Sequence, residues 1–379
     1  MNRIRPVLIL LSSTKVILLC LILMMFLVVF GTISQIHISS FEAQQSYFNS
    51  FLIFSQTPLG ISIPVFPGGL SVGILCITSL ISSILVRNRY NLKQAGLLIV
   101  HGGLIILIAG QLFSQIFSEE SQMPIQEGQT LNYSIDFHRV ELAIIKDFGD
   151  GKERTVVIPQ AFLKSGEVIK IPELPFSIRV KELFQNSKLV SFSKEKTKNI
   201  ITEDAVKNVH IEELPANIQD SQFNIVSAYV EILNENENFG IWLLSSGIKD
   251  AQIFQFQGTE YHLLMRPRRN ILPFTLTLKD FSHELYPGTD VPRHFSSLLN
   301  LKDPKHKEDR DVLIYMNHPL RYGGYAFYQA SFGNDDMLSV LQVVRNPMWV
   351  APYLSSSLIL IGLAIHFGIH LLKFDRFKT

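Results

Sequence analysis

Four long apolar runs interrupt the chain, and each is long enough to cross a lipid bilayer. A membrane helix needs about 20 predominantly apolar residues to cover the ~30 Å hydrocarbon core. The runs extend over about 16–36, 66–86, 96–117 and 348–372. We therefore predict three transmembrane helices in an N-terminal membrane region, 1–117, and a fourth in a C-terminal region, 347–379.

Between the third and fourth runs the pattern changes to alternating apolar and polar residues, which is typical of half-buried β-strands. Residues 140–146 and 155–158 flank Gly149-Asp150-Gly151 and predict one hairpin, and residues 225–233 with 241–244 predict a second. The fold class is therefore an integral membrane α plus β protein. A large β-rich extracytoplasmic domain, 118–346, is inserted between helices 3 and 4.

Two segments of this β-rich region resemble each other. Leu174–Phe184 reads LPFSIRVKELF and Leu272–Phe281 reads LPFTLTLKDF, and each follows a strand that begins with Val-Glu, at Val140 and Val230. The repetition predicts two similar lobes with the two segments in equivalent strands. Chance similarity is the alternative, because alternating strands use a small set of residue types.

Composition supports membrane residence. The 379 residues are 47% hydrophobic and 18% charged, with a mean hydropathy of +0.22 and a formal net charge of +1. No basic stripe indicates a nucleic-acid partner. Both cysteines, Cys20 and Cys76, lie inside apolar runs, which disfavours disulfides, zinc cages and CxxC redox couples. The sequence contains no CxxCH for covalent haem.

Basic residues gather beside the apolar runs and predict the orientation of the chain. Cytoplasmic loops of membrane proteins carry an excess of Lys and Arg. The cations are Arg3, Arg5, Lys15, Arg87, Arg89, Lys93, Lys373, Arg376 and Lys378. We therefore predict a multi-pass membrane protein with both termini in the cytoplasm.

The third apolar run contains a titratable side chain, His101. An imidazole inside a span needs a partner, a cavity or a bound ligand. Four glycines lie nearby, Gly96, Gly102, Gly103 and Gly110, and glycines allow a backbone or a flat ligand to approach closely. The simpler interpretation is a packing helix whose histidine bonds to a neighbour.

The fourth run carries His366 and, one turn later, His370. His101 lies 8 residues after Lys93 and His366 lies 7 before Lys373, which places both roughly 10–12 Å inside the membrane. Two imidazoles at one depth could bind a metal or serve as axial ligands to haem iron. The alternatives are a polar contact between helices 3 and 4, and a proton relay. A relay would be expected to include an Asp or Glu within the spans, and none occurs there.

No sequence motif assigns catalysis. The outside histidines show no tight metal-ligand spacing, and we find no nucleophile elbow, P-loop, dinucleotide fingerprint or HExxH. The sequence therefore assigns no catalytic residue, and it leaves open whether the protein is an enzyme.

Several motifs together resemble the ResB-like family of cytochrome c biogenesis proteins. They are Gly31-Thr32-Ile33, His101-Gly102-Gly103-Leu104 with Gly110, Asp280-Phe281 with Glu284, Tyr286-Pro287-Gly288-Thr289, Asn317-His318-Pro319-Leu320-Arg321-Tyr322-Gly323-Gly324 and Phe327-Tyr328-Gln329-Ala330-Ser331. The last two are the most specific. In this family an intramembrane histidine of the third span is implicated in holding haem, and His101 matches it.

The resemblance implies a haem-handling assembly factor for c-type cytochromes that binds haem b transiently. Its partners would be a tryptophan-rich multispanning membrane protein and apocytochrome c, and the chain would be at most a subunit of the haem-attachment complex. This chain lacks the tryptophan-rich segment, since its only tryptophans are Trp242 and Trp349. The expected cofactor-binding residues are His101 as the iron ligand and His366, with His370, Gly102 and Gly103 as weaker candidates. The competing hypothesis is a membrane-anchored β-domain scaffold that recruits envelope proteins without haem.

Overall fold

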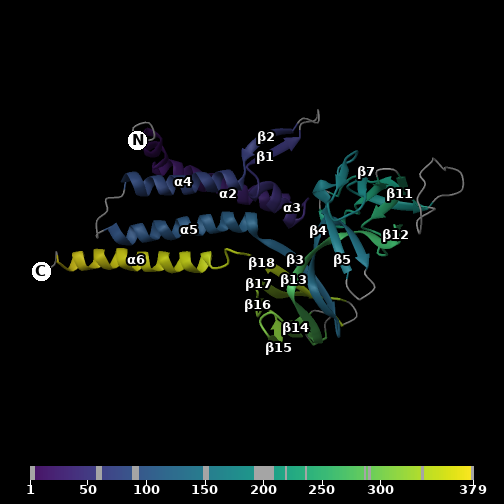
Figure 1. Ribbon diagram of the computed structural model, residues 1–379. Coiled ribbons are helices and arrows are strands. Elements are labelled where there is room, and N and C mark those ends of the chain that lie inside the picture. Colours follow the sequence, from purple (N-terminus) through teal and green to yellow (C-terminus); the bar gives the residue numbers. More distant parts are fainter. Residues whose placement is uncertain are drawn as a thin grey trace. The chain divides into compact units, whose positions relative to one another are not determined.

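The computed structural model describes residues 5–56, 62–87, 94–147, 153–191, 209–217, 220–234, 237–285, 287–288, 292–333 and 337–376 (Figure 1). The chain forms two compact units. The helical unit comprises residues 1–119, 323–325 and 344–379, and the β unit comprises residues 120–322 and 326–343. Of the cations that predict the orientation, Arg3, Arg89, Lys93 and Lys378 lie outside the described residues.

Within its described residues, the helical unit contains four helices long and apolar enough to cross a membrane. They are α2 (Thr14–Ser34), α4 (Gly69–Arg87), α5 (Ala95–Phe117) and α6 (Ala351–Arg376). A short helix, α1 (Arg5–Leu11), precedes them, and α3 (Ser40–Ala43), a π-helical turn (Gln44–Phe48) and the strands β1 (Leu52–Gln56) and β2 (Ser62–Pro67) lie between α2 and α4. The second span starts at Gly69 rather than residue 66, because Phe66 and Pro67 pair with Ile53 and Leu52 in the β1–β2 hairpin.

The surfaces of these helices are apolar. Large side chains of α2, such as Leu18, Met25 and Val28, are more than half exposed, and so are Leu360 and Leu371 of α6. Soluble proteins rarely expose contiguous apolar surface on this scale. Lipid is the solvent that matches it, which agrees with a membrane protein.

Helices α2, α4 and α5 pack around one small cluster. Val72, Cys76 and Leu80 of α4 are buried together with Cys20 and Leu27 of α2. Both cysteines are free and buried, and they lie in the same cluster. The sequence pattern did not indicate that they would meet, because each occupies a separate apolar run.

The β unit is built from three sheets among the residues described. The largest has the order β15-β14-β13-β4-β3-β18-β17-β16, with β12 beside β13 and β5 beside β4; the others are β11-β10-β7-β6 and the hairpin β8-β9. The strands are β3 (Glu119–Gln126), β4 (Thr130–Asp147), β5 (Glu153–Pro159), β6 (Val168–Lys170), β7 (Ser177–Phe184), β8 (Ser187–Ser191), β9 (Val209–Glu213), β10 (Ser227–Asn234), β11 (Glu237–Ser245), β12 (Gln252–Phe256), β13 (Thr259–Leu285), β14 (Pro292–Asp303), β15 (Glu308–Tyr315), β16 (Leu320–Tyr322), β17 (Tyr325–Phe332) and β18 (Leu338–Arg345).

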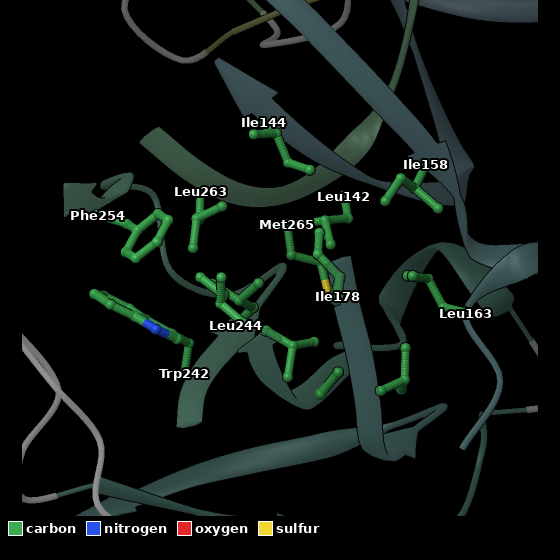
Figure 2. Close-up of a cluster of buried hydrophobic side chains, with 14 of the residues drawn as sticks. Leu142, Ile144, Ile158, Leu163, Ile178, Trp242, Leu244, Phe254, Leu263 and Met265 are labelled. Carbon is green, nitrogen blue, oxygen red and sulfur yellow. The ribbon is translucent and has the colours of Figure 1, made fainter. Parts of the chain in front are cut away.

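A hydrophobic core forms where the four-stranded sheet packs on one part of the large sheet (Figure 2). Ile178 of β7 and Leu244 of β11 lie on one side, and Leu142 of β4 and Met265 of β13 lie on the other. Alternate residues of each strand point into this core, which explains the period of two in the sequence.

Both predicted hairpins are present. β4 pairs with β5 from Glu141 opposite Pro159 to Asp147 opposite Glu153, and β10 pairs with β11 from Ser227 opposite Ser245 to Asn234 opposite Glu237. The predicted turn Gly149-Asp150-Gly151 lies outside the described residues. The second hairpin is longer than predicted, because its strands continue through polar residues beyond Leu233.

The prediction of two equivalent lobes is wrong. Both repeated segments contain strand, but β7 belongs to the four-stranded sheet, whereas Leu272–Phe281 lies within the 27-residue β13 of the large sheet. Their neighbours differ as well, since β7 pairs with β6 and β10, and β13 pairs with β4 and β14 along Leu276–Thr277. An alternating pattern reports which face of a strand is buried, and it does not report which strands lie beside it.

Candidate functional site

The third and fourth spans pack closely through glycines spaced seven residues apart. Gly96, Gly103 and Gly110 of α5 are all buried. A Cβ added at Gly96 would lie 2.5 Å from the backbone nitrogen of His366, and one added at Gly110 would lie 2.5 Å from the Ala351 Cβ. The α6 backbone therefore lies directly against this stripe of α5.

His101 lies on a different face of α5. It is two residues from Gly103, which places it roughly 160° around the helix from the α6-facing stripe. Leu104, Ile105 and Ile108 pack on the α2–α4 cluster, and His101 continues this second stripe toward the start of α5. Figure 1 shows α5 between α4 and α6. His101 is therefore on the α4 side of α5.

The imidazole of His101 is held in one tautomer. Its Nδ1 lies 2.8 Å from the Leu97 carbonyl oxygen, one turn earlier in α5, and the residue is half-buried. Because a carbonyl oxygen only accepts, Nδ1 must carry the proton in this bond. The lone pair is therefore on Nε2, and a histidine held through its other nitrogen is the usual arrangement for a metal ligand.

The two glycines after His101 have different surroundings. A Cβ at Gly102 would have nothing within 4 Å, whereas one at Gly103 would lie 2.8 Å from Ile359 Cγ1 and 3.0 Å from the Ser355 carbonyl oxygen. Gly102 leaves space beside His101 for a flat group. The space beside Gly103 is instead filled by α6. Gly103 therefore allows the two helices to pack, and it leaves no room for the cofactor that we expected there.

His366 lies on the face of α6 that contacts α5, beside Gly96. Its Nδ1 is buried and has no hydrogen-bond partner among the residues that the structure describes. The His370 ring is 4.5 Å from the His366 ring between centroids, and His370 Nδ1 lies 2.8 Å from the His366 carbonyl oxygen. These two histidines form a pair of their own at the α5–α6 contact.

The structure does not bring His101 and His366 together. Because Gly96 meets His366 and Gly103 meets Ile359 in this antiparallel pair, His101 is level with about Ile361. The two imidazoles are thus offset by five residues, roughly 7–8 Å, and lie on opposite faces of α5. The prediction of one common depth is wrong, because the glycine contacts set the register and α6 continues past Lys373 to Arg376.

The histidines of the β unit take part in separate local contacts. His262 pairs with Glu260 at 3.0 Å, and the rings of His318 and Tyr315 stack with centroids 4.6 Å apart. Among the described residues, no group of three or more His, Cys, Asp or Glu is arranged to hold a metal ion.

A buried carboxylate, Asp303, organises the turn between β14 and β15. Its side chain is 2% exposed and accepts hydrogen bonds from His306 Nδ1 at 2.7 Å, the Tyr322 hydroxyl at 2.9 Å and the Lys305 backbone nitrogen at 2.9 Å. These donors, His306 foremost, lower the pKa of Asp303 to about 2 although burial acts in the opposite direction. Burial and the neighbouring carboxylates raise the pKa of Tyr322.

We expect acid to destabilise the β unit through Asp303. A carboxyl whose pKa is lower in the folded than in the unfolded chain stabilises the fold above its unfolded pKa, and this contribution disappears as the pH falls through the folded pKa. The loss should run from the ordinary value of 3.8 to about 2. Thermal unfolding against pH should show a flatter acid limb for Asp303→Asn than for the natural protein. The exposed Asp250→Asn is the control and should leave the limb unchanged; equal slopes in all three proteins would contradict this role.

Several motif residues of the last strands pack in the β unit or form its turns. Phe327 is fully buried against Phe274, and Gln329 accepts a bond from Ser297 at 2.7 Å and donates one to Ser339 at 3.0 Å. The turn Gly323-Gly324 joins β16 to β17 with φ of 58° and 83° at its two residues, as a two-residue hairpin turn requires. Of the Tyr286–Thr289 motif, Tyr286 and Thr289 lie outside the described residues.

Comparison with known proteins places these motifs in a family. The ResB-like family model matches residues 247–340. Protein NrfI of Wolinella succinogenes is 37% identical over 97 residues, which are 26% of this chain and 11% of that protein. The aligned segment thus spans about a tenth of the relative's length. The motifs from Asp280 to Ser331 fall inside the family match, whereas His101 lies in α5. Residues 247–340 of this chain are therefore similar to the ResB-like family.

Proposed function

We propose that this chain is a haem-handling assembly factor for c-type cytochrome maturation, in which His101 is an axial ligand of haem b. The observation that carries the proposal is the state of His101. Its Nδ1 is bound to the Leu97 carbonyl oxygen, which leaves Nε2 with the lone pair, and Gly102 beside it has open space. The family match supports the role in cytochrome c maturation.

The residues around His101 fit the edge of a porphyrin. The bond to Leu97 fixes the plane of the imidazole, and the missing side chain at Gly102 leaves room on the neighbouring face. The apolar stripe of Leu104, Ile105 and Ile108, which packs on the α2–α4 cluster, continues from His101 along the same face of α5. Haem would supply the iron centre that is delivered to the acceptor cytochrome.

His366 would not hold the same haem as His101 in this proposal, because it lies beside Gly96 on the opposite side of α5. The partner is a tryptophan-rich multispanning membrane protein, and the β unit presents apocytochrome c outside the bacterial cytoplasmic membrane. Both termini are cytoplasmic in this arrangement.

The substitution His101→Gly tests the ligand. It removes the imidazole but leaves a gap that free imidazole can fill, so purified complex should lose most of its Soret absorbance and regain part of it when imidazole is added. Cytochrome c maturation in cells should follow the same pattern. His366→Gly is the matched control. Its Soret band should remain, because His366 lies on the face of α6 that contacts Gly96, away from His101. If His101→Gly keeps haem content and cytochrome output at natural levels, the scaffold hypothesis replaces this one.

A further inference from the structure

The segment between α2 and α4 presents an apolar surface that nothing described in the helical unit covers. From Ala43 to Val86 the sequence contains no Asp, Glu, Lys or Arg. Within it, β1 and β2 form a two-stranded antiparallel sheet of their own. Ile53 and Phe66 pack on the α2–α4 cluster, but five large apolar side chains in and beside the two strands are more than two-fifths exposed: Phe51, Leu52, Phe54, Ile63 and Val65.

The base of this hairpin is fixed to the first turn of α4. The Gly68 nitrogen donates to the Phe51 carbonyl oxygen at 2.9 Å, and the Ser71 hydroxyl donates to the same oxygen at 2.6 Å. A Cβ at Gly69 would lie 2.5 Å from the Phe48 carbonyl oxygen, so the two segments touch through their backbones. The hairpin is therefore held where α4 begins.

The helix contacts give the level of the hairpin along the bundle. Gly73 of α4 contacts Leu112 of α5, and Gly110 of α5 contacts Ala351 of α6. The start of α4 is therefore at the same end of the bundle as Trp349 and Tyr353, which are 50% and 63% exposed. Aromatic residues of this kind gather where hydrocarbon meets the headgroups. The hairpin thus leaves the bundle at the membrane–water interface.

Physical chemistry restricts where such a hairpin can lie. A two-stranded sheet has two open edges, whose unpaired backbone groups are not tolerated against lipid tails. An isolated two-stranded hairpin is also at best marginally stable in water. The headgroup layer satisfies both demands, because water reaches the backbone edges while apolar side chains enter the acyl boundary.

We propose that the paired strands β1 and β2, residues 52–56 and 62–67, are a membrane-interface anchor that inserts Phe54 and its apolar neighbours among phospholipids. The complete absence of charge from this segment favours lipid over a protein partner, since a specific protein interface would be expected to carry a polar rim. The anchor does not depend on haem binding by His101. It would hold the end of α4, and with it the α4 side of α5, at a fixed depth.

Fluorescence quenching in nanodiscs of phosphatidylcholine and phosphatidylglycerol tests the anchor. A fluorophore is attached at Phe54→Cys, and in a second variant at Val65→Cys. Cys20 and Cys76 are buried, so the reagent reacts with the introduced, exposed thiol, and the natural protein treated in the same way gives the background labelling. Phe162→Cys is the matched control, because Phe162 is 63% exposed, close to the 59% of Phe54, but belongs to the β unit. Labelled variants must keep the natural unfolding temperature.

At position 54 we expect strong quenching by lipids that carry a nitroxide near the headgroup, and weaker quenching by lipids labelled deep in the tail. Aqueous iodide should quench the fluorophore at position 54 several-fold less than the one at position 162. Two results would overturn the proposal. Iodide quenching equal to that at position 162, without lipid quenching, would place the hairpin in water. Protection from both quenchers would show that protein covers it. If position 54 fails to fold when labelled, position 65 decides by the same criteria.

Discussion

Gly96→Ala should destabilise the packing of α5 on α6 strongly. The added methyl would lie 2.5 Å from the backbone nitrogen of His366, 2.6 Å from the Gly362 carbonyl oxygen and 2.8 Å from the His366 Cα. All three are backbone atoms, which cannot rotate away, so the helices must separate along the whole stripe. Overpacking of this kind costs typically about 1–3 kcal/mol, which exceeds the ~1 kcal/mol that alanine gains over glycine in a helix.

The neighbouring glycine provides the control. Gly102→Ala makes the same chemical change on the same helix, but nothing lies within 4 Å of the new methyl. Unfolding in mixed micelles with increasing denaturing detergent should show a lower midpoint for Gly96→Ala and an unchanged or higher one for Gly102→Ala. Equal midpoints for the two variants would mean that α6 does not lie against the 96–103–110 stripe.

Glu141→Gln should be among the most destabilising changes in the β unit. Glu141 of β4 lies opposite Arg266 of β13, and the carboxylate and guanidinium are 3.0 Å apart with side chains only 4% and 11% exposed. Neutralising the glutamate leaves a buried guanidinium without its counter-charge. Removing one partner of a buried ion pair costs about 3–5 kcal/mol, mainly because the remaining charge stays desolvated.

An exposed ion pair of the same unit gives the comparison. Lys164 and Glu167 are 3.8 Å apart, with side chains 68% and 56% exposed. Chemical denaturation should show little change for Glu167→Gln, since exposed pairs contribute about 0–1 kcal/mol. If Glu141→Gln unfolds at the same denaturant concentration as Glu167→Gln, then the Glu141–Arg266 pair does not stabilise the folded state.

Periodicity alone predicted much of the fold. Runs of about 20 apolar residues gave the four long helices to within a few residues, and alternation gave the hairpins β4–β5 and β10–β11. These features depend on local chain geometry, because a residue's spacing along a helix or strand decides which face it occupies. The predicted start of the second helix at residue 66 is wrong, because an apolar residue such as Phe66 suits a strand as well as a helix.

Pairing between distant segments could not be predicted in this way. The similarity of Leu174–Phe184 and Leu272–Phe281 reflects the common demands of buried strands, and only the sheet order shows that they have different neighbours. The meeting of Cys20 with Cys76 is likewise a property of how α2 packs on α4. The Glu141–Arg266 pair joins residues 125 positions apart, and neither residue signals its partner.

The candidate site likewise has features that the sequence predicts and features that only the tertiary structure shows. The sequence by itself determined that an imidazole, His101, lies among glycines inside a helix long and apolar enough to cross a membrane, because residue types and run lengths are sufficient for that. Only the tertiary structure decided that Gly103 contacts α6 while Gly102 is open, and that His366 lies beside Gly96 on the opposite face of α5 from His101. Helix register and rotation follow from where backbones can approach closest, and the distances of His101 and His366 from flanking cations contain no information about that contact.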